Sequence, residues 1–345
     1  MLNFRFLIAL TAIFCCTQVR LTRAESTSVL RVCSQNLYRL GESGKSKKRS
    51  ETQLEDLTKR FMRAECDVIA VQEVVGSSES LALESLGVLA KAWERSLGEK
   101  ILFYVGGDSI DEHIRSGFLV RSSVGKVAAI KTYPSEPVPS VQRLGPVLYF
   151  PRAPMALVLD TPGLKPRKRF WILNIHQKSP VFGYKDGSGT DFELLRTEMA
   201  EALRNIVERE EKQEKQDTVF IVTGDRNSEG SSASAAVLWG KMELSDFERA
   251  GGCQIKKDGS PQCKTERKRE PDYVGLFARR HELFPDKYPG GTYMYKKRQR
   301  SLDEISIKQK DLRLVTRENG KLSIGLEGEY FRGSDHRLVW AEFRF

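Results

Sequence analysis

Apolar and polar positions along the chain follow the two periods of a mixed α/β protein. Residues 30–36 alternate between apolar and polar, which is typical of a strand. Residues 67–73 and 218–225 are nearly continuous apolar runs, which favour strands buried on both faces. Between the first two strands, apolar residues at 54–61 recur at helical spacing. The pattern therefore predicts a strand–helix–strand unit near the N-terminus.

The rest of the chain continues this alternation of elements. Helices are expected over 79–97, 191–215 and 233–243. Further strands are expected over 101–105, 117–121, 155–159, 169–176, 291–295, 301–307 and 336–345. No internal repeat and no change of composition marks a linker. We therefore expect one domain over residues 25–345, with a mixed sheet core, outer helices and an insertion near 250–272.

The first residues have the build of a secretory signal. Arg5 precedes an apolar run over 6–16, and small residues follow at Thr22 and Ala24. This run is too short to span a bilayer comfortably, and a buried N-terminal helix is the alternative interpretation. We expect residues 1–24 to be removed from a protein that is secreted, either outside the cell or into a periplasm, without stable membrane insertion. We also expect a monomer.

The net charge of the chain indicates which class of partner it binds. The 345-residue chain is 40% hydrophobic and 30% charged, a globular composition that excludes a disordered chain. Its formal net charge is +10, and removal of residues 1–24 with their three arginines leaves +7. A basic surface favours an anionic partner such as nucleic acid or anionic lipid. The basic clusters lie at 45–49, 165–169, 264–269 and 296–300.

Four cysteines remain after residue 24. Cys253 and Cys263 bracket a polar loop, which makes them the better candidates for a disulfide in an exported protein. Cys33 and Cys66 lie in or beside apolar runs, so we expect them to be buried thiols. The chain has neither a Cys-x-x-Cys nor a His-x-x-x-His spacing, which disfavours a zinc-finger type of site.

Polar side chains that carry chemistry gather at the ends of predicted strands. Strand ends are where sites form in α/β folds. The residues at these ends are Asn36, Glu73, His176, Asp225, Asp335 and His336. Each alone is also explained as a polar residue that closes a strand, whereas the joint pattern favours a site. A carboxylate such as Glu73 at the edge of a buried sheet is costly unless it meets a cation, and a hard divalent metal would satisfy it.

These motifs resemble a known superfamily when they are read in order. The set is Gln35-Asn36, Gln72-Glu73, Asn174-x-His176, Gly224-Asp225-x-Asn227, Ser301-Leu-Asp303 and Ser334-Asp335-His336. It resembles the endonuclease/exonuclease/phosphatase superfamily from about residue 30 to the C-terminus. The resemblance implies the deoxyribonuclease-I-like α/β fold. In that fold a two-sheet mixed β-sandwich carries helices on both outer faces, in four layers ordered α/β/β/α.

The resemblance also implies a metal site and a general base. Asn36, Glu73 and Asp335 would hold a divalent metal, with Mg²⁺ expected and Mn²⁺ or Ca²⁺ as alternatives. The metal would act as a Lewis acid on the phosphate. His336 would be the base toward the attacking water, and Asp303 would orient its imidazole. Glu304 follows where the family usually has Tyr, His or Gln, so it would either add charge near the site or point outward.

The remaining implied roles concern the nucleophile and the phosphate. Asp225 and Asn227 would position the nucleophile and a phosphate oxygen, and in some members the Asp is itself proposed as the base. His176 would bind the scissile phosphate and protonate the leaving oxygen. Arg152, and more weakly Asn174, would contact the phosphate.

The function predicted from these features is a secreted, metal-dependent phosphodiesterase, namely a nuclease that cleaves DNA, with RNA left open. One alternative is a lipid enzyme of the same superfamily, either sphingomyelinase-like or a phosphoinositide phosphatase. Such an enzyme needs an exposed apolar loop, and residues 147–150 are the candidate. The other alternative is a non-catalytic binding protein, which the complete set of site residues argues against.

Overall fold

Two mixed sheets face each other in the centre of the molecule. The computed structural model describes residues 29–41, 51–106, 113–141, 147–161, 168–180, 189–265, 269–278, 290–318, 321–330 and 333–345. Within these ranges, the first sheet has the order β19 (Ile324–Glu327), β20 (Leu338–Arg344), β1 (Val29–Leu40), β2 (Val68–Val75), β4 (Ile114–Arg121), β3 (Ile101–Val105). The second sheet has the order β13 (Tyr273–Gly275), β16 (Asp303–Lys308), β10 (Thr218–Asp225), β9 (Lys168–His176), β8 (Met155–Thr161), β5 (Lys126–Thr132).

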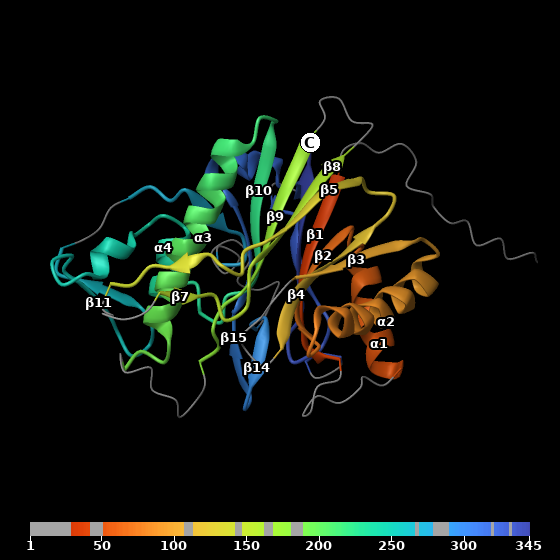
Figure 1. Cartoon of the computed structure of the whole chain (residues 1–345), viewed down its shortest axis with the longest axis horizontal. Coiled ribbons are helices and arrows are strands. Elements are labelled where there is room, and N and C mark those ends of the chain that lie inside the picture. The colour runs from red at the N-terminus through yellow and green to blue at the C-terminus, as the bar shows by residue number, and fades with distance from the viewer. Residues whose placement is uncertain are drawn as a thin grey trace, which may run out of the picture.

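Helices cover the outer face of each sheet (Figure 1). The helices α1 (Glu51–Arg63) and α2 (Glu79–Leu97) lie against the first sheet, and α3 (Glu193–Gln213) and α4 (Ala233–Leu238) lie against the second. The short elements are β6 (Pro137–Val138), β7 (Leu148–Tyr149), η1 (Leu244–Phe247), β11 (Cys253–Ile255), β12 (Pro261–Cys263), β14 (Tyr293–Tyr295), β15 (Arg298–Arg300), η2 (Gln309–Leu314), β17 (Arg317–Glu318) and β18 (Lys321–Leu322). The predicted four-layer α/β/β/α sandwich is confirmed.

The alternation of side chains along each strand divides the core into three layers. Val32 of β1 and Ile172 of β9 point into the central layer between the sheets. Their neighbours Cys33 and Trp171 point the other way, toward the helices. Because both faces of β2 and β10 are buried in the same way, these two strands read as nearly continuous apolar runs. This is why they were the elements most easily predicted.

Local signals fix the ends of α2. The Ser78 side chain accepts a hydrogen bond from the Leu81 amide at 3.3 Å, which satisfies one of the free amides of the first turn. Gly98 ends the helix in the left-handed region, at φ 71°. These signals agree with the predicted range of 79–97.

Several elements differ from the prediction. The strands β5, β13 and β19 were not predicted, because they are short or half-exposed edge strands without a clear apolar alternation. The helix expected over 233–243 ends at Leu238. The strand expected from residue 301 begins at Asp303. The predicted signal peptide, residues 1–24, lies outside the described residues, as does the basic cluster at 45–49. Among the helices described, none is long and apolar enough to cross a membrane.

Both cysteine pairs form disulfides. Cys253 pairs with Cys263 across the β11–β12 hairpin, as predicted. Cys33 pairs with Cys66, so the expectation of buried thiols was wrong, although both residues are buried. The reason lies in the parallel pairing of β1 with β2. This pairing brings the start of β2 beside Cys33 and leaves the two Cα atoms 5.9 Å apart. An apolar sequence context does not distinguish such a pair from two free thiols.

Removing the Cys33–Cys66 disulfide should lower stability by an amount that depends on the length of the loop it closes. Replacing both residues by Ala opens a loop with a sequence separation of 33. We expect the free energy of unfolding to fall by about 3–4 kcal/mol in the chain-entropy model. Guanidinium denaturation of the variant beside the native protein measures this loss. The matched variant without Cys253–Cys263, a separation of 10, should lose about 2–3 kcal/mol. Four reactive thiols in the unfolded, unreduced mature protein would contradict both pairings.

Candidate active site

The strand ends meet at one edge of the two-sheet core. β1 and β2 run parallel, and Asn36 pairs with Gln72 just before Glu73. β9 and β10 also run parallel, and their last residues, His176 and Asp225, are register partners. Because parallel strands end on the same side, these side chains come together. β16 and β20 run antiparallel to their neighbours and begin at this edge, which places Asp303 and His336 there too.

Bulges in β1 and β2 re-aim the side chains at this edge. The register of β2 against β4 shifts between Val71 and Val74, and within this bulge Glu73 has a φ of 61°. The register of β1 shifts after Asn36, where Tyr38 has a φ of 50°. A left-handed conformation costs a non-glycine residue about 1–2 kcal/mol. Bulges of this kind often lie beside active sites, where they redirect one side chain out of the ladder.

Asp225 is the centre of a buried hydrogen-bond network. Its Oδ2 accepts from the Asn36 side-chain amide at 3.1 Å and from the Asn227 side-chain amide at 3.2 Å. Its Oδ1 accepts from the Asn227 backbone amide at 2.8 Å. The preceding Gly224 has a φ of 136°, and a Cβ there would overlap the backbone of Ile175. The glycine thus lets β10 approach β9 closely enough for this network to form.

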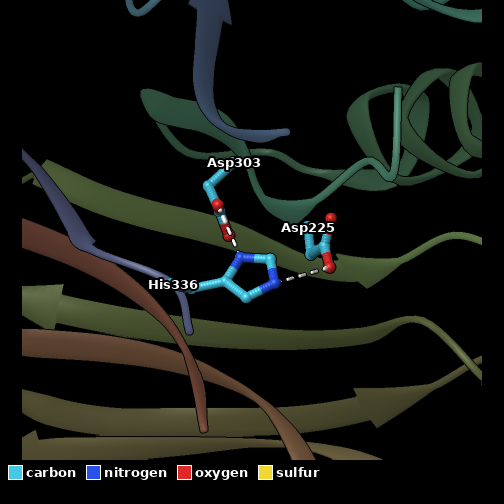
Figure 2. Close-up of side chains that lie close together, drawn as sticks. All are labelled: Asp225, Asp303 and His336. Carbon is cyan, nitrogen blue, oxygen red and sulfur yellow. Dashed lines mark hydrogen bonds and ion pairs between the residues drawn. The ribbon is translucent and has the colours of Figure 1, made fainter. Parts of the chain in front are cut away.

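The His336 imidazole lies between two carboxylates (Figure 2). Its Nδ1 is 2.8 Å from Asp303 Oδ2, and its Nε2 is 3.9 Å from Asp225 Oδ2. The Tyr293 ring packs against the imidazole at an interplanar angle of 40°, with ring centroids 4.6 Å apart. Burial lowers the pKa of His336. The charges of Asp303, Asp225 and Asp335 outweigh that effect and raise the pKa to about 10. The imidazole is therefore charged at neutral pH.

Burial acts on the nearby carboxyl groups in the opposite direction. It raises the pKa of Asp225 to about 6, although the charge of His336 works to lower that pKa. It also raises the pKa of Asp335 to about 6, and the charge of Glu73 adds to this effect. Buried carboxylates prefer the neutral form because the low-dielectric interior penalises charge. Both groups are therefore ionised at pH 7 but bind a proton more readily than surface acids do.

A second histidine faces the same carboxylates. His176 Nε2 lies 3.6 Å from Asp225 Oδ2 and 3.8 Å from Glu73 Oε1. Arg152 Nη1 contacts the same nitrogen at 2.6 Å and donates to the Gln177 carbonyl at 3.1 Å. Burial, followed by the charge of Arg152, holds the pKa of His176 well below its usual range. A neutral His176 accepts this hydrogen bond and thereby orients the Arg152 guanidinium.

Oxygen donors suited to a divalent cation lie beside this network. The Asn36 side-chain amide is 3.1 Å from Glu73 Oε1. Asp335 Oδ1 is buried and has no hydrogen-bond partner among the described residues. Carboxylate and amide oxygens are the donors that Mg²⁺, Mn²⁺ and Ca²⁺ prefer. The carboxylates of Glu73 and Asp335 thus fit such an ion. The Asn36 side-chain oxygen accepts from the Tyr38 amide at 2.9 Å, and its nitrogen faces Glu73 and Asp225.

A different group also meets a distance criterion for metal binding. Asp225, Asp303 and His336 each offer one ligand atom, and these atoms lie within 4.8 Å of one another. In this group the Asp303 Oδ2 is already engaged by the His336 Nδ1, whereas Asp335 Oδ1 has no hydrogen-bond partner among the described residues.

Most of the residues expected at the site do lie together at this edge. They are Asn36, Glu73, Arg152, His176, Asp225, Asn227, Asp303, Asp335 and His336. Asn174 is the exception. Its side-chain amide donates to the carbonyls of Val71 and Gly117, both at 2.8 Å, and its Oδ1 accepts from Gln72 at 2.7 Å. Since these bonds engage both its nitrogen and its oxygen, Asn174 ties the two sheets together rather than contacting a phosphate.

Glu304 points away from the site. Strand alternation in β16 sends it to the face opposite Asp303. Its carboxylate accepts from the Phe277 amide at 2.7 Å and the Ala278 amide at 3.1 Å, and it lies 3.8 Å from the Arg226 guanidinium. The departure from the family pattern at this position therefore adds no charge beside His336.

The sequence did not reveal two residues that hold the site in place. The Thr292 hydroxyl accepts from the amides of Leu302 and Asp303, both at 3.0 Å, and so fixes the start of β16. Tyr293 packs against His336 with its ring tilted by 40°. The sequence predicted residues 291–295 only as a strand, and that prediction assigned no role to either side chain.

Comparison with known proteins rests on structure. No protein-family model and no curated protein matches the sequence. A family protein of endonuclease/exonuclease/phosphatase type from Leptotrichia buccalis matches with a TM-score of 0.52 and 13% identity, covering 92% of this chain and 100% of its own. The human Nocturnin catalytic domain with a bound sulfate anion matches with a TM-score of 0.53 and 12% identity, over 92% and 94%.

A third structure, D. rerio TDP2 complexed with a single-strand DNA product, matches with a TM-score of 0.51 and 15% identity, over 92% of this chain and 100% of its own. Identities this low establish the fold alone. The matches cover nearly the whole chain, and the polar residues at the strand ends form one site. The chain therefore has the deoxyribonuclease-I-like α/β sandwich fold of the endonuclease/exonuclease/phosphatase superfamily.

Proposed function

We propose that this protein is a secreted, metal-dependent phosphodiesterase that hydrolyses nucleic acid, with DNA as the favoured substrate. The observation that carries the proposal is the buried chain Asp303–His336–Asp225 beside the unpartnered carboxylate oxygen of Asp335. Such a site combines a cation, a proton acceptor and oxygen ligands for a metal. All of them are buried or half-buried at one edge of the two-sheet core. These are the parts that phosphodiester hydrolysis requires.

The protonation states of Asp225 and His336 give these two groups different roles in the reaction. Asp225, with a pKa of about 6, is ionised at neutral pH and is basic enough to accept a proton from water. His336, with a pKa of about 10, is already protonated and is a poor base. We therefore assign the base to Asp225 rather than to His336. The charged imidazole would instead stabilise the negative charge that develops on the phosphate.

The phosphate would be held from two sides. A divalent cation on Asn36, Glu73 and Asp335 would supply Lewis-acid chemistry to a phosphate oxygen when bound. Arg152 would contact the phosphate from the opposite side. His176 orients that guanidinium, and its low pKa argues against a role as proton donor to the leaving oxygen.

Nucleic acid is supported as the substrate by a basic hairpin. The strands β14 and β15 form a hairpin whose residues 295–299 are exposed, with Lys296, Lys297 and Arg298 among them. In Figure 1 the hairpin projects from the edge of the molecule. Its first residue, Tyr293, packs against the His336 ring, so the basic tip extends from the site itself. The single-strand DNA product bound to D. rerio TDP2 supports the same substrate class.

A lipid substrate is the second candidate, because one apolar pair is exposed shortly before Arg152 in the sequence. Val147 is 60% exposed and Tyr149 is 45% exposed, a few residues before Arg152. Exposed apolar side chains of this kind can insert into a membrane surface. This pair exposes two apolar side chains, whereas the basic hairpin exposes five residues, so nucleic acid is the favoured substrate class.

Export is supported by the two disulfides. Structural disulfides persist in oxidising compartments and are rare in the cytosol. Cys33–Cys66 is buried in the layer between α1 and the first sheet, where it joins β1 to the α1–β2 turn. This agrees with the signal peptide predicted from the sequence.

The proposal predicts metal-dependent nicking of plasmid DNA. We expect the mature protein to nick supercoiled plasmid with Mg²⁺, to stop when EDTA is added, and to lose about 100- to 10,000-fold in rate on Asp225→Asn. Asp160→Asn is the matched control, because Asp160 binds Arg169 at the opposite end of the strands. Hydrolysis of sphingomyelin or phosphoinositide vesicles, with intact plasmid and folded protein, would favour the lipid candidate instead.

The hairpin predicts a specific change in salt dependence. Replacing Lys296 and Lys297 by Ala should weaken duplex DNA binding and lower the slope of log K against log salt by about 0.9 for each lost phosphate contact. The same charge change at Lys212 and Lys215, at the far end of α3, should leave the slope unchanged. Fluorescence anisotropy in the Asp225→Asn background measures both. Equal slopes for the two double variants would rule out the hairpin as a nucleic-acid contact.

A further inference from the structure

Arg60 places a guanidinium in the interior of the protein. It belongs to α1, is 1% exposed, and donates to the carbonyl of His336 at 2.8 Å and that of Glu329 at 2.6 Å. It also donates to the Gln35 side-chain oxygen at 3.3 Å. Burial lowers the pKa of Arg60 to about 10. Taking an arginine out of water costs free energy, so its position calls for a physical reason.

The contacts of Arg60 join the two segments that carry the site. Gln35 donates from its side-chain amide to the Asn36 carbonyl at 2.6 Å and to the His336 carbonyl at 3.3 Å. Arg60 and Gln35 thus converge on the main chain of His336. Asn36 ends the regular part of β1, and His336 precedes β20. The guanidinium therefore fixes the backbone of one site residue relative to the other.

The backbone just after β19 is shaped around Arg60. Gly328 has a φ of 90°, and a Cβ at this position would overlap the Arg60 guanidinium. Glycine is thus required at residue 328 by both the backbone conformation and the side chain facing it. One turn further along α1, Arg63 pairs at the surface with Glu327, the last residue of β19, at 3.1 Å.

Packing alone does not account for Arg60. Leu57 and Phe61 already bury the apolar face of α1, and Phe61 packs edge-on against Trp93 of α2 with ring centroids 5.4 Å apart. A methionine of similar length would fill the same space without the cost of burying a charge. Replacing buried charged groups by apolar ones of similar volume is often neutral or stabilising. An arginine here is therefore explained better by what it binds than by the space it fills.

We propose that Arg60 is a positioning residue, which holds the His336 backbone so that its imidazole stays between Asp303 and Asp225. This inference rests on the proposed phosphodiesterase function for its activity readout. It also makes a structural claim that does not depend on activity: the main chain around His336 moves when Arg60 is replaced, while the rest of the fold does not.

The test compares Arg60→Met with the matched control Arg63→Met in the full mature protein. For Arg60→Met we expect kcat on duplex DNA to fall about 10- to 100-fold, since a displacement of about 1 Å in an active site can cost that much. We expect KM to stay within about twofold, because Arg60 does not face the substrate. Arg63→Met should keep both constants. Arg60→Lys should recover only part of kcat, because one ammonium cannot replace the planar fork that reaches separate oxygens.

A second readout separates positioning from general stability. In Arg60→Met, amide resonances and hydrogen exchange should change at residues 335–337 and at Asn36 while the strand amides of the second sheet stay protected. Gly328→Ala should push Arg60 aside and reproduce these changes, and combining it with Arg60→Met should lower kcat no further than either variant alone. If native-like kcat and unchanged amides at 335–337 are found, the proposal is wrong. A kcat loss matched by loss of protection across both sheets would also overturn it.

An inactive native protein would leave the two claims separable. If no phosphodiester is hydrolysed by the native protein, the proposed function fails. The amide changes at 335–337 would then still support or overturn the positioning role of Arg60 on their own.

Discussion

The contact of His336 with two carboxylates depends on the packing of one sheet against the other. His336 leads into β20 of the first sheet, whereas Asp225 and Asp303 lie on β10 and β16 of the second. Neither sheet holds the site by itself. The apolar layer between the sheets supplies the driving force for packing, and Asn174 adds hydrogen bonds across it. The site is thus a product of the same packing that stabilises the fold.

Burial gives this site its electrostatic character. Asp225, Asp303 and Asp335 lie around one imidazole with little water, so the carboxyl groups raise the pKa of His336 while burial raises those of Asp225 and Asp335. Like charges at such short range destabilise one another unless a cation joins them. The charged imidazole provides one cation, and the proposed metal ion beside Glu73 and Asp335 would provide a second.

Much of the fold and part of the site could be predicted from local sequence patterns. A polar residue directly after a continuous apolar run, as at Glu73 and Asp225, marks a strand end without knowledge of the fold. The order of these motifs then indicated the superfamily fold. Side-chain contacts between distant segments left no such local pattern. The disulfide from Cys33 to Cys66 and the bulge that turns Glu73 both depend on how β1, β2 and β4 pair.

Residue type was misleading where tertiary contacts override it. Arg60 is not among the apolar residues whose spacing predicted α1, yet it is buried against main-chain oxygens. Asn174 follows a family motif, yet its side chain is fully engaged between the sheets. Glu304 reads as added charge near the site, yet strand alternation turns it to the opposite face. In each case the position of the side chain depends on a partner more than 20 residues away along the chain. A local pattern of apolar and polar residues does not reveal such a partner.

The measurement that tests this account most directly is the titration of His336 by NMR, in protein with labelled histidine and without added metal. The account predicts a pKa of about 10 for His336, and a fall toward the ordinary value of 6.5 on Asp303→Asn. Because the folded-state pKa is raised, the stability contributed by the charged imidazole should be full below about pH 6.5 and lost progressively as pH rises to about 10. A His336 that titrates near 6.5 in the native protein, unaffected by Asp303→Asn, would contradict the claim that two carboxylates hold a charged imidazole at the centre of the site.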